Sequence, residues 1–127
     1  AFDLALVCGK DETTRARAAA LAPALAAGRR TIKVYGFTRK MKELISASAL
    51  VVSKAGPALM CEIAACGKPN IVASFIPGQE KPNVEWLQRN GAGLYRPGLL
   101  ELRAAVERML DDEGYRRRFE ERIRCLD

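Results

Sequence analysis

The sequence predicts an α/β domain in which a parallel sheet carries helices on both faces. Short apolar runs alternate with longer segments of helical periodicity along the chain. The apolar runs are continuous, which is typical of parallel strands that are buried on both sides. Gly and Pro punctuate the junctions between these segments. At 127 residues, the chain is expected to form one domain with its own core.

Two strands and two helices are expected before residue 48. Asp11 and Glu12 favour a helix start because acidic side chains stabilise the positive end of a helix, and Gly28 is expected to follow its end. Met41 and Ile45 repeat at helical spacing. The expected elements are strands at 2–7 and 31–35 and helices at 11–27 and 39–47.

The same alternation continues to the end of the chain. Pro57 favours a helix start, and Gly67 follows the end of that helix. Asn83 is expected to cap the next helix and Gly91 to stop it. The expected elements are strands at 49–53, 70–75 and 92–95, and helices at 57–66, 83–90, 99–110 and after Gly114. The order implies right-handed crossovers, as in Rossmann-like sheets.

The loops that follow the strands are the candidate functional segments, because ligands of such sheets bind beyond the carboxyl ends of the strands. The helix that begins at Pro57 offers free backbone N–H groups and a positive dipole end to a phosphate. Glu62, just over one turn into that helix, can chelate a diol. Gln79 and Glu80 can reach sugar hydroxyls. Together these residues predict a nucleotide-sugar site.

Cysteine and histidine usage limits the chemistry. The four cysteines include no CxxC pair and the chain has no histidine, so no metal site or disulfide framework is expected. The cysteines are expected to be buried, reduced thiols of a cytoplasmic protein. Without histidine, base catalysis needs a carboxylate or another domain. No cofactor is expected.

The net charge of +6 is unevenly distributed. Residues 101–127 are nearly balanced, with seven Arg against eight acids, whereas residues 29–42 carry six basic side chains and no acid. That basic segment is either a contact for an anionic membrane or partner, or simply exposed to solvent. No nucleic-acid motif accompanies it. No run approaches 18 apolar residues, so a cytoplasmic location is expected, with peripheral contact at the inner face of the cell membrane as an option.

The order of these segments resembles the donor-binding, C-terminal domain of GT-B glycosyltransferases of family 28. The resemblance covers nearly the whole chain, residues 1–127, and is closest to the processive diacylglycerol glucosyltransferases and monogalactosyldiacylglycerol synthases. The sharpest segment is Ile76-Pro77-Gly78-Gln79-Glu80 with Asn83 downstream. The other matching segments are Gly36-Phe37-Thr38 with Met41, Lys54-Ala55-Gly56-Pro57, Glu62-Ile63-Ala64, Gly67-Lys68-Pro69 and Asn90-Gly91-Ala92-Gly93.

The resemblance implies a role for each matching residue. Phe37 would hold uracil, the backbone at 56–58 the pyrophosphate, and Glu62 the ribose hydroxyls. Gln79 and Glu80 would bind the sugar, with help from Asn83. The expected substrate-binding residues are Phe37, Met41, Gly56, Pro57, Ala58, Leu59, Glu62, Gln79, Glu80 and Asn83.

Each of these residues also has a plain structural interpretation. Gly56-Pro57 is a common helix start, Asn83 an ordinary N-cap, and Phe37 and Met41 can be core residues. Leu59 departs from the family, which has Thr there. Loss of that hydrogen bond to phosphate would cost about 1.5–3 kcal/mol.

The resemblance implies an inverting, metal-independent transfer of a hexose from a UDP-sugar to a lipid acceptor, best matched by diacylglycerol. The family's first βα unit and its acceptor-binding domain are not found in this chain. The catalytic base is therefore expected outside it, and the chain alone is expected to be inactive. Two alternatives stay open: a donor-binding subunit of a split N-acetylglucosaminyltransferase, and a non-catalytic nucleotide-sugar module, which Leu59 favours.

Overall fold

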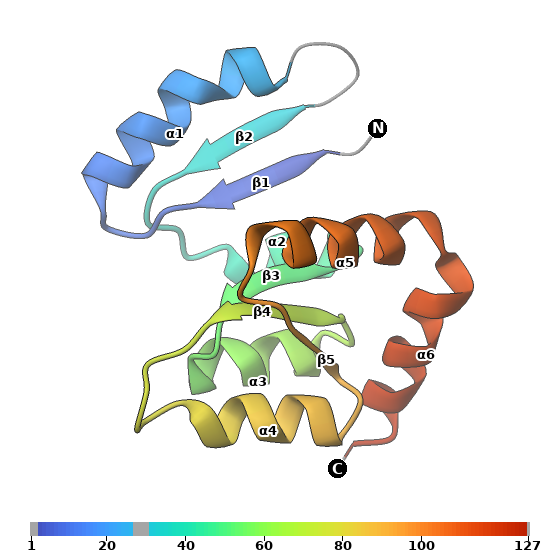
Figure 1. Cartoon of the computed structure of the whole chain (residues 1–127). Helices are drawn as coiled ribbons and strands as arrows, with labels where there is room; N and C mark the ends of the chain where they lie inside the picture. Colours follow the sequence, from blue (N-terminus) through green and yellow to red (C-terminus); the bar gives the residue numbers. More distant parts are fainter. Residues whose placement is uncertain (1–2, 27–30, 127) are drawn as a thin grey trace. The chain divides into compact units, whose positions relative to one another are not determined.

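The computed structural model describes residues 3–26 and 31–126 (Figure 1). These residues divide into two compact units, Ala1–Leu44 and Ile45–Asp127. Helix α2, Met41–Ser46, begins in the first unit and ends in the second. The predicted strand start at Phe2, the Gly28 helix end, and Arg29 and Arg30 of the basic segment lie outside the described residues.

The first unit is a β-α-β arrangement. Strands β1, Leu4–Val7, and β2, Ile32–Tyr35, pair in parallel. Helix α1, Glu12–Leu25, connects them and contacts β2. Asp11 is the N-cap of α1, since its carboxylate accepts hydrogen bonds from the Thr14 N–H at 3.1 Å and the Thr14 hydroxyl at 2.7 Å. The predicted helix start at Asp11 is confirmed.

The second unit holds a three-stranded parallel sheet in the order β3-β4-β5. Figure 1 shows α3 and α4 on one side of this sheet and α5 on the other. The predicted fold, a parallel sheet with helices on both faces, is confirmed for this unit. Its elements are β3 Val51–Lys54, α3 Pro57–Ala65, β4 Asn70–Ser74, α4 Lys81–Arg89, β5 Gly93–Tyr95, α5 Leu99–Asp111 and α6 Glu113–Arg124.

The core of the second unit lies on both faces of β4. Successive strand side chains point to opposite faces, so Val72 and Ile71 enter different clusters. Val72 packs with apolar residues of α3 and α4, among them Met60 and Leu87. Ile71 packs with Met109 of α5. Packing on both faces fixes the central strand, β4, and therefore also fixes the position of its carboxyl end.

Strand burial is less complete than the continuous apolar pattern predicts. Only β4 begins with three consecutive buried residues. In β1, Leu4 and Val7 are exposed, and in β3, Val52 is 45% exposed. Within the described chain, β1 and β3 each pair with one strand, whereas β4 is flanked by two. The prediction of buried strands is therefore wrong for β1 and β3, because their second edges carry no ladder.

The helix ends agree with the glycine positions. Gly67 and Gly91 follow α3 and α4 with φ of 72° and 64°, a backbone region that glycine adopts without steric cost. The predicted cap at Asn83 is wrong. Helix α4 begins two residues earlier, at Lys81, with Glu80 in the N-cap position and Pro82 in the first turn. Asn83 is instead inside the helix.

The cysteines are free thiols, as expected, but they are not buried. Cys61 and Cys125 are exposed, and Cys8 and Cys66 are partly exposed. The prediction of buried thiols is wrong because Cys61 lies on the outer side of α3, opposite the buried Ile63. Among the helices of residues 3–26 and 31–126, none is long and apolar enough to cross a bilayer.

Candidate functional site

The carboxyl ends of β3, β4 and β5 meet at one edge of the second unit. Parallel pairing brings Lys54, the last residue of β3, level with Ser74, the last of β4. The Ala55 N–H donates to the Ser74 carbonyl at 2.9 Å, which extends the pairing by one residue. The segments after β3 and β4 therefore leave the sheet side by side, as predicted for residues 54–56 and 76–83.

The start of α3 lies at this edge. Gly56 is the N-cap, in extended conformation and with no side-chain cap. The first intrahelical bond runs from the Met60 N–H to the Gly56 carbonyl at 3.0 Å. Pro57 has no N–H, so the amides of Ala58 and Leu59 are the donors that the helix itself leaves free. Such a terminus attracts anions.

Glu62 lies on α3, four residues after Ala58 and on the same side of the helix. Side chains of a helix tilt toward its N-terminus, so the carboxylate is directed toward the open end of α3. Glu62 is partly exposed. A carboxylate there can accept two hydrogen bonds from a diol while the amides of Ala58 and Leu59 hold an anion.

The segment between β4 and α4 is a closed loop. The Ile76 carbonyl accepts from the Gln79 N–H at 3.2 Å and the Glu80 N–H at 3.0 Å. Gly78 takes a φ of 82°, which favours glycine at the turn. The Gln79 side chain is exposed. The loop therefore presents Gln79 to solvent at the carboxyl edge, where sugar recognition is predicted.

Glu80 is buried, in contrast to Gln79. It retains 6% exposure, and its carboxylate accepts from the Ile76 N–H at 2.8 Å and from the Lys54 ammonium at 3.0 and 3.3 Å. The hydrogen bond from Ile76, followed by that from Lys54, lowers the pKa of Glu80 below its ordinary value. Glu80 Oε2 would lie 3.8 Å from a β-carbon built on Gly56, so this carboxylate lies beside the N-cap of α3.

Asn83 connects α4 to the turn before α3. Its side-chain N–H donates to the Ala55 carbonyl at 3.0 Å. Ala55 is fully buried, so its carbonyl depends on a protein partner. Asn83 thus holds the start of α3 and the start of α4 together, and does not serve as the N-cap that the sequence predicts.

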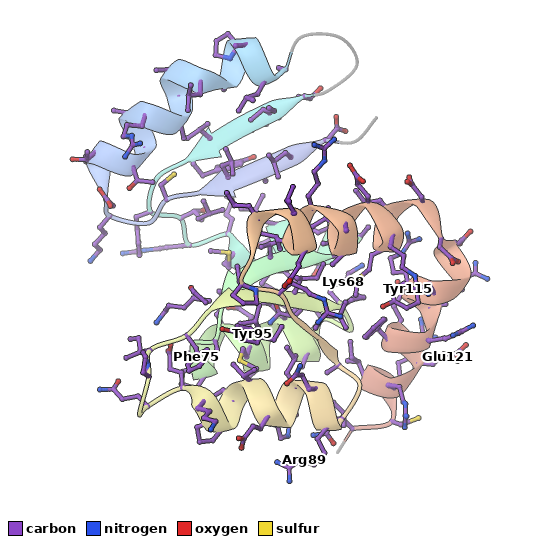
Figure 2. All side chains as sticks on the ribbon, in the orientation of Figure 1. Lys68, Phe75, Arg89, Tyr95, Tyr115 and Glu121 are labelled. Carbon is purple, nitrogen blue, oxygen red and sulfur yellow. The ribbon has the colours of Figure 1, made fainter. Side chains whose placement is uncertain are left out.

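An aromatic pair supports the same edge. The rings of Phe75, just after β4, and Tyr95, at the end of β5, meet edge to face with centroids 5.5 Å apart (Figure 2). Such pairs stabilise beyond simple burial by about 0.5–1.5 kcal/mol. The pair links the segments that leave β4 and β5, and with them the loop that carries Gln79.

Phe37 and Met41 belong to the first unit. Phe37 follows β2 and is 62% exposed, so its interpretation as a core residue is wrong. The Lys10 ammonium lies 5.1 Å from the centre of its ring, within cation–π range. Met41, the first residue of α2, is partly exposed. The structure places Glu80 beside Gly56 and Asn83 against Ala55, whereas the parts of Glu62, Gln79, Phe37 and Met41 in the site stay predictions.

Lys54 is the site residue that the sequence did not assign a role. It ends β3, its side chain is 50% exposed, and it forms the ion pair with Glu80. The sequence did contain a signal for this role, because a lysine at the end of an apolar strand indicates an acidic partner at the sheet edge. Its partner lies 26 residues away, and local periodicity does not reach that far.

Comparisons with known proteins agree with the predicted family. The model of the glycosyltransferase family 28 C-terminal domain matches residues 2–97. Monogalactosyldiacylglycerol synthase 3 of Arabidopsis thaliana is 42% identical over 64 residues, which are 50% of this chain and 14% of that protein. The processive diacylglycerol beta-glucosyltransferase of Bacillus subtilis is 29% identical over 121 residues, 95% of this chain and 31% of that protein.

A solved structure confirms the fold. Spinosyn forosaminyltransferase SpnP has a TM-score of 0.66 and 15% identity, and the match covers 96% of this chain and 38% of that protein. This structural similarity confirms the expected GT-B glycosyltransferase fold for this chain. The chain spans less than a third of the two curated relatives. Because the family model covers most of its residues, the chain belongs to glycosyltransferase family 28, as its C-terminal domain.

Proposed function

We propose that this chain is the UDP-sugar-binding part of an inverting glycosyltransferase that transfers a hexose to diacylglycerol. One observation supports the proposal: the N-terminus of α3 and the loop that bears the exposed Gln79 follow two adjacent strand ends of a family 28 domain, with Glu62 further along α3. The curated relatives are named for sugar transfer that yields glycosyl diacylglycerols.

The donor's pyrophosphate would bind at the start of α3. The amides of Ala58 and Leu59 donate hydrogen bonds there, and the helix dipole adds positive potential. Glu62 would hold the ribose hydroxyls, since it lies on the same side of α3. Phe37 and the backbone beside it would hold the uracil, as the family resemblance implies, and Met41 is proposed as a further substrate-binding residue. Leu59 contributes its backbone only, which weakens phosphate binding by one hydroxyl bond.

The hexose would meet the loop between β4 and α4. Gln79 is exposed and offers both a donor and an acceptor, which suits sugar hydroxyls. Asn83 is partly exposed and holds the loop against α3 through Ala55. These contacts would orient the anomeric carbon for attack from the opposite face.

In the proposed reaction, an acceptor hydroxyl attacks the anomeric carbon and inverts it, while the bond to UDP breaks. A base outside this chain takes the hydroxyl proton. Negative charge that develops on UDP is stabilised by the α3 amides, which are preorganised before the reaction. No residue of this chain is assigned proton transfer, so the chain alone is proposed to be inactive.

The acceptor side is proposed to come from another domain or a partner subunit at a membrane surface. The described basic residues of the segment 29–42 are all exposed: Lys33, Arg39, Lys40 and Lys42. Such a group attracts anionic headgroups with about 1 kcal/mol per cation near the surface. We therefore propose peripheral contact at the cytoplasmic face of the membrane.

A non-catalytic nucleotide-sugar module is the second candidate, and Leu59 is the observation that favours it. A donor-binding subunit of a split N-acetylglucosaminyltransferase is a variant of the main proposal. Both predict donor binding by this chain. They differ in whether transfer appears once the acceptor-binding part is supplied.

Calorimetric titration tests the proposal. UDP, UDP-glucose, UDP-galactose and UDP-N-acetylglucosamine are titrated into the chain, with GDP-mannose as the base control. Saturable binding of uridine nucleotides that Glu62→Ala weakens about tenfold, the size of one charge-assisted hydrogen bond, supports it. Glu85→Ala, an exposed glutamate of α4, is the matched control. Equal binding of wild type and Glu62→Ala would contradict the assigned site.

A further inference from the structure

We propose that Lys54 and Glu80 form a positioning pair that fixes the loop 76–80, so that Gln79, and not Glu80, faces the hexose. This inference rests on the proposed function and proposes a different role for one residue of the sequence prediction, Glu80. The family resemblance assigns both Gln79 and Glu80 to the sugar. The two side chains differ in their contacts, which indicates that they have different roles.

The Glu80 carboxylate is already occupied by protein donors. Oε1 accepts from the Ile76 N–H at 2.8 Å and from Lys54 Nζ at 3.3 Å, and Oε2 accepts from Lys54 Nζ at 3.0 Å. The side chain is 8% exposed, against an exposed Gln79. To bind a sugar hydroxyl, Glu80 would have to leave these charge-assisted hydrogen bonds, which are among the stronger ones in proteins.

These contacts close the loop on itself and onto β3. Ile76 is bonded to Glu80 twice, through its own N–H to the carboxylate and through its carbonyl to the Glu80 N–H at 3.0 Å. Lys54 then anchors the carboxylate to the end of β3, which packs on the buried β4. The exposed Gln79 lies within this closed turn. Its direction is therefore set by the pair.

The ion pair also reduces the repulsion between the Glu80 carboxylate and an anionic ligand at the same edge. The Glu80 carboxylate lies beside the Gly56 N-cap of α3, where an anionic ligand is proposed. An unpaired carboxylate there would repel that ligand. Lys54 neutralises it and keeps half of its side-chain surface exposed. Lys54 is thus a positioning residue for the sugar loop. By neutralising Glu80, it also removes the charge that would repel a phosphate at this edge.

Binding ratios test the pair. Affinities for UDP and for UDP-galactose are measured with wild type, Lys54→Met, Glu80→Gln, the double variant and the control Lys81→Met, an exposed lysine one residue from Glu80. UDP carries about one more negative charge than UDP-galactose near pH 7, so Lys81→Met, which also removes one positive charge, gives the change in ratio that charge alone produces. Lys54→Met and Glu80→Gln should each lower the preference for the sugar nucleotide about tenfold, the size of one lost hydrogen bond.

The double variant should lose no more than either single variant, because both act through one loop conformation. Gln79→Ala should show the same loss. A loss in Glu80→Gln without one in Lys54→Met would overturn the proposal, since Glu80 would then be a direct sugar ligand. Unchanged ratios in both would overturn it as well.

Amide hydrogen exchange at Ile76 provides a readout that needs no ligand. The Ile76 N–H should be protected in wild type and in Lys81→Met, and should exchange at least about tenfold faster in Lys54→Met and Glu80→Gln. If no nucleotide binds to wild type, the proposed function fails, yet faster exchange in both variants still supports the pair. Equal exchange rates in all proteins would reject the pair regardless of binding.

Discussion

The side-chain amide of Asn83 lies 3.0 Å from the backbone carbonyl of Ala55, to which it donates a hydrogen bond. Ala55 precedes the open end of α3, and Asn83 lies in the first turn of α4. One side chain therefore sets the spacing between the proposed phosphate site and the proposed sugar loop. Its role is internal support, which differs from the helix cap that its residue type suggests.

Asn83→Ala should lower the free energy of unfolding by about 1–3 kcal/mol, because the buried Ala55 carbonyl loses its side-chain donor. Gln88→Ala, an exposed position on the same helix, should change it by less than about 0.5 kcal/mol. Urea unfolding followed by circular dichroism measures both. Equal stabilities of wild type and Asn83→Ala would show that the hydrogen bond is dispensable.

Gly93→Ala should destabilise the second unit by at least about 2 kcal/mol, since overpacking forces the backbone to move. A β-carbon at Gly93 would clash with the Asn70 carbonyl oxygen, where β5 begins its pairing with β4. Gly114→Ala is the control, because its β-carbon would lie 3.5 Å from the nearest side-chain atom, in helix α6. Gly114→Ala should match or exceed wild-type stability. The same urea experiment measures both variants, and a tolerated alanine at 93 would contradict the packing.

Acid should weaken the contribution of Glu80 to stability. The hydrogen bonds from Ile76 and Lys54 lower its pKa in the folded state. Folding therefore favours the carboxylate, and this contribution is full above the ordinary pKa of the group and is lost as pH falls through the lowered one. Asp11, whose pKa is lowered by the Thr14 hydroxyl and then by the Thr14 N–H, behaves in the same way.

The test compares wild type with Glu80→Gln in urea between pH 7 and pH 3. The stability difference between them should be largest near pH 7 and should shrink on acidification, since protonation removes the charge that the variant lacks. A difference that is constant across this range would mean that the charge of Glu80 plays no part in folding.

The exposed basic residues of the segment 29–42 should bind anionic vesicles. Sedimentation with phosphatidylglycerol vesicles should fall severalfold when Lys33, Arg39, Lys40 and Lys42 are all changed to Gln. It should fall also as salt rises from about 0.05 to 0.5 M, because surface charges are screened. A control with the same change in charge replaces Lys81, Arg89, Arg117 and Arg118. Equal loss in both variants would indicate general charge attraction and no specific membrane face.

Local patterns were sufficient for the order of elements and for the glycine-terminated helices. Gly67 and Gly91 end α3 and α4 because a positive φ favours glycine, and this requirement is visible in the sequence. Asn83 was misplaced because cap preference competes with a helix start at Lys81-Pro82, where proline is also favoured. Pro82 was the available signal.

Contacts between residues that are far apart in the chain could not be predicted from local sequence patterns. A glutamate in a polar loop is ordinarily exposed, and Glu80 is buried only because Lys54 and the Ile76 N–H reach its carboxylate. The Asn83 contact with Ala55 spans 28 residues in the same way. The family resemblance predicted the segment, and the proposed division of roles between Gln79 and Glu80 rests on hydrogen bonds that the sequence does not show.

The most direct test of the proposed donor site is chemical-shift mapping of the ¹⁵N-labelled chain during addition of UDP-galactose. The amide signals of Ala58, Leu59 and Gln79 should shift saturably, and Glu62→Ala should require a higher ligand concentration for the same shifts. Signals at the opposite ends of the elements, such as Gly67 and Gly91, should stay in place. Shifts confined to that opposite edge, or none with ligand in large excess, would contradict the proposed donor site.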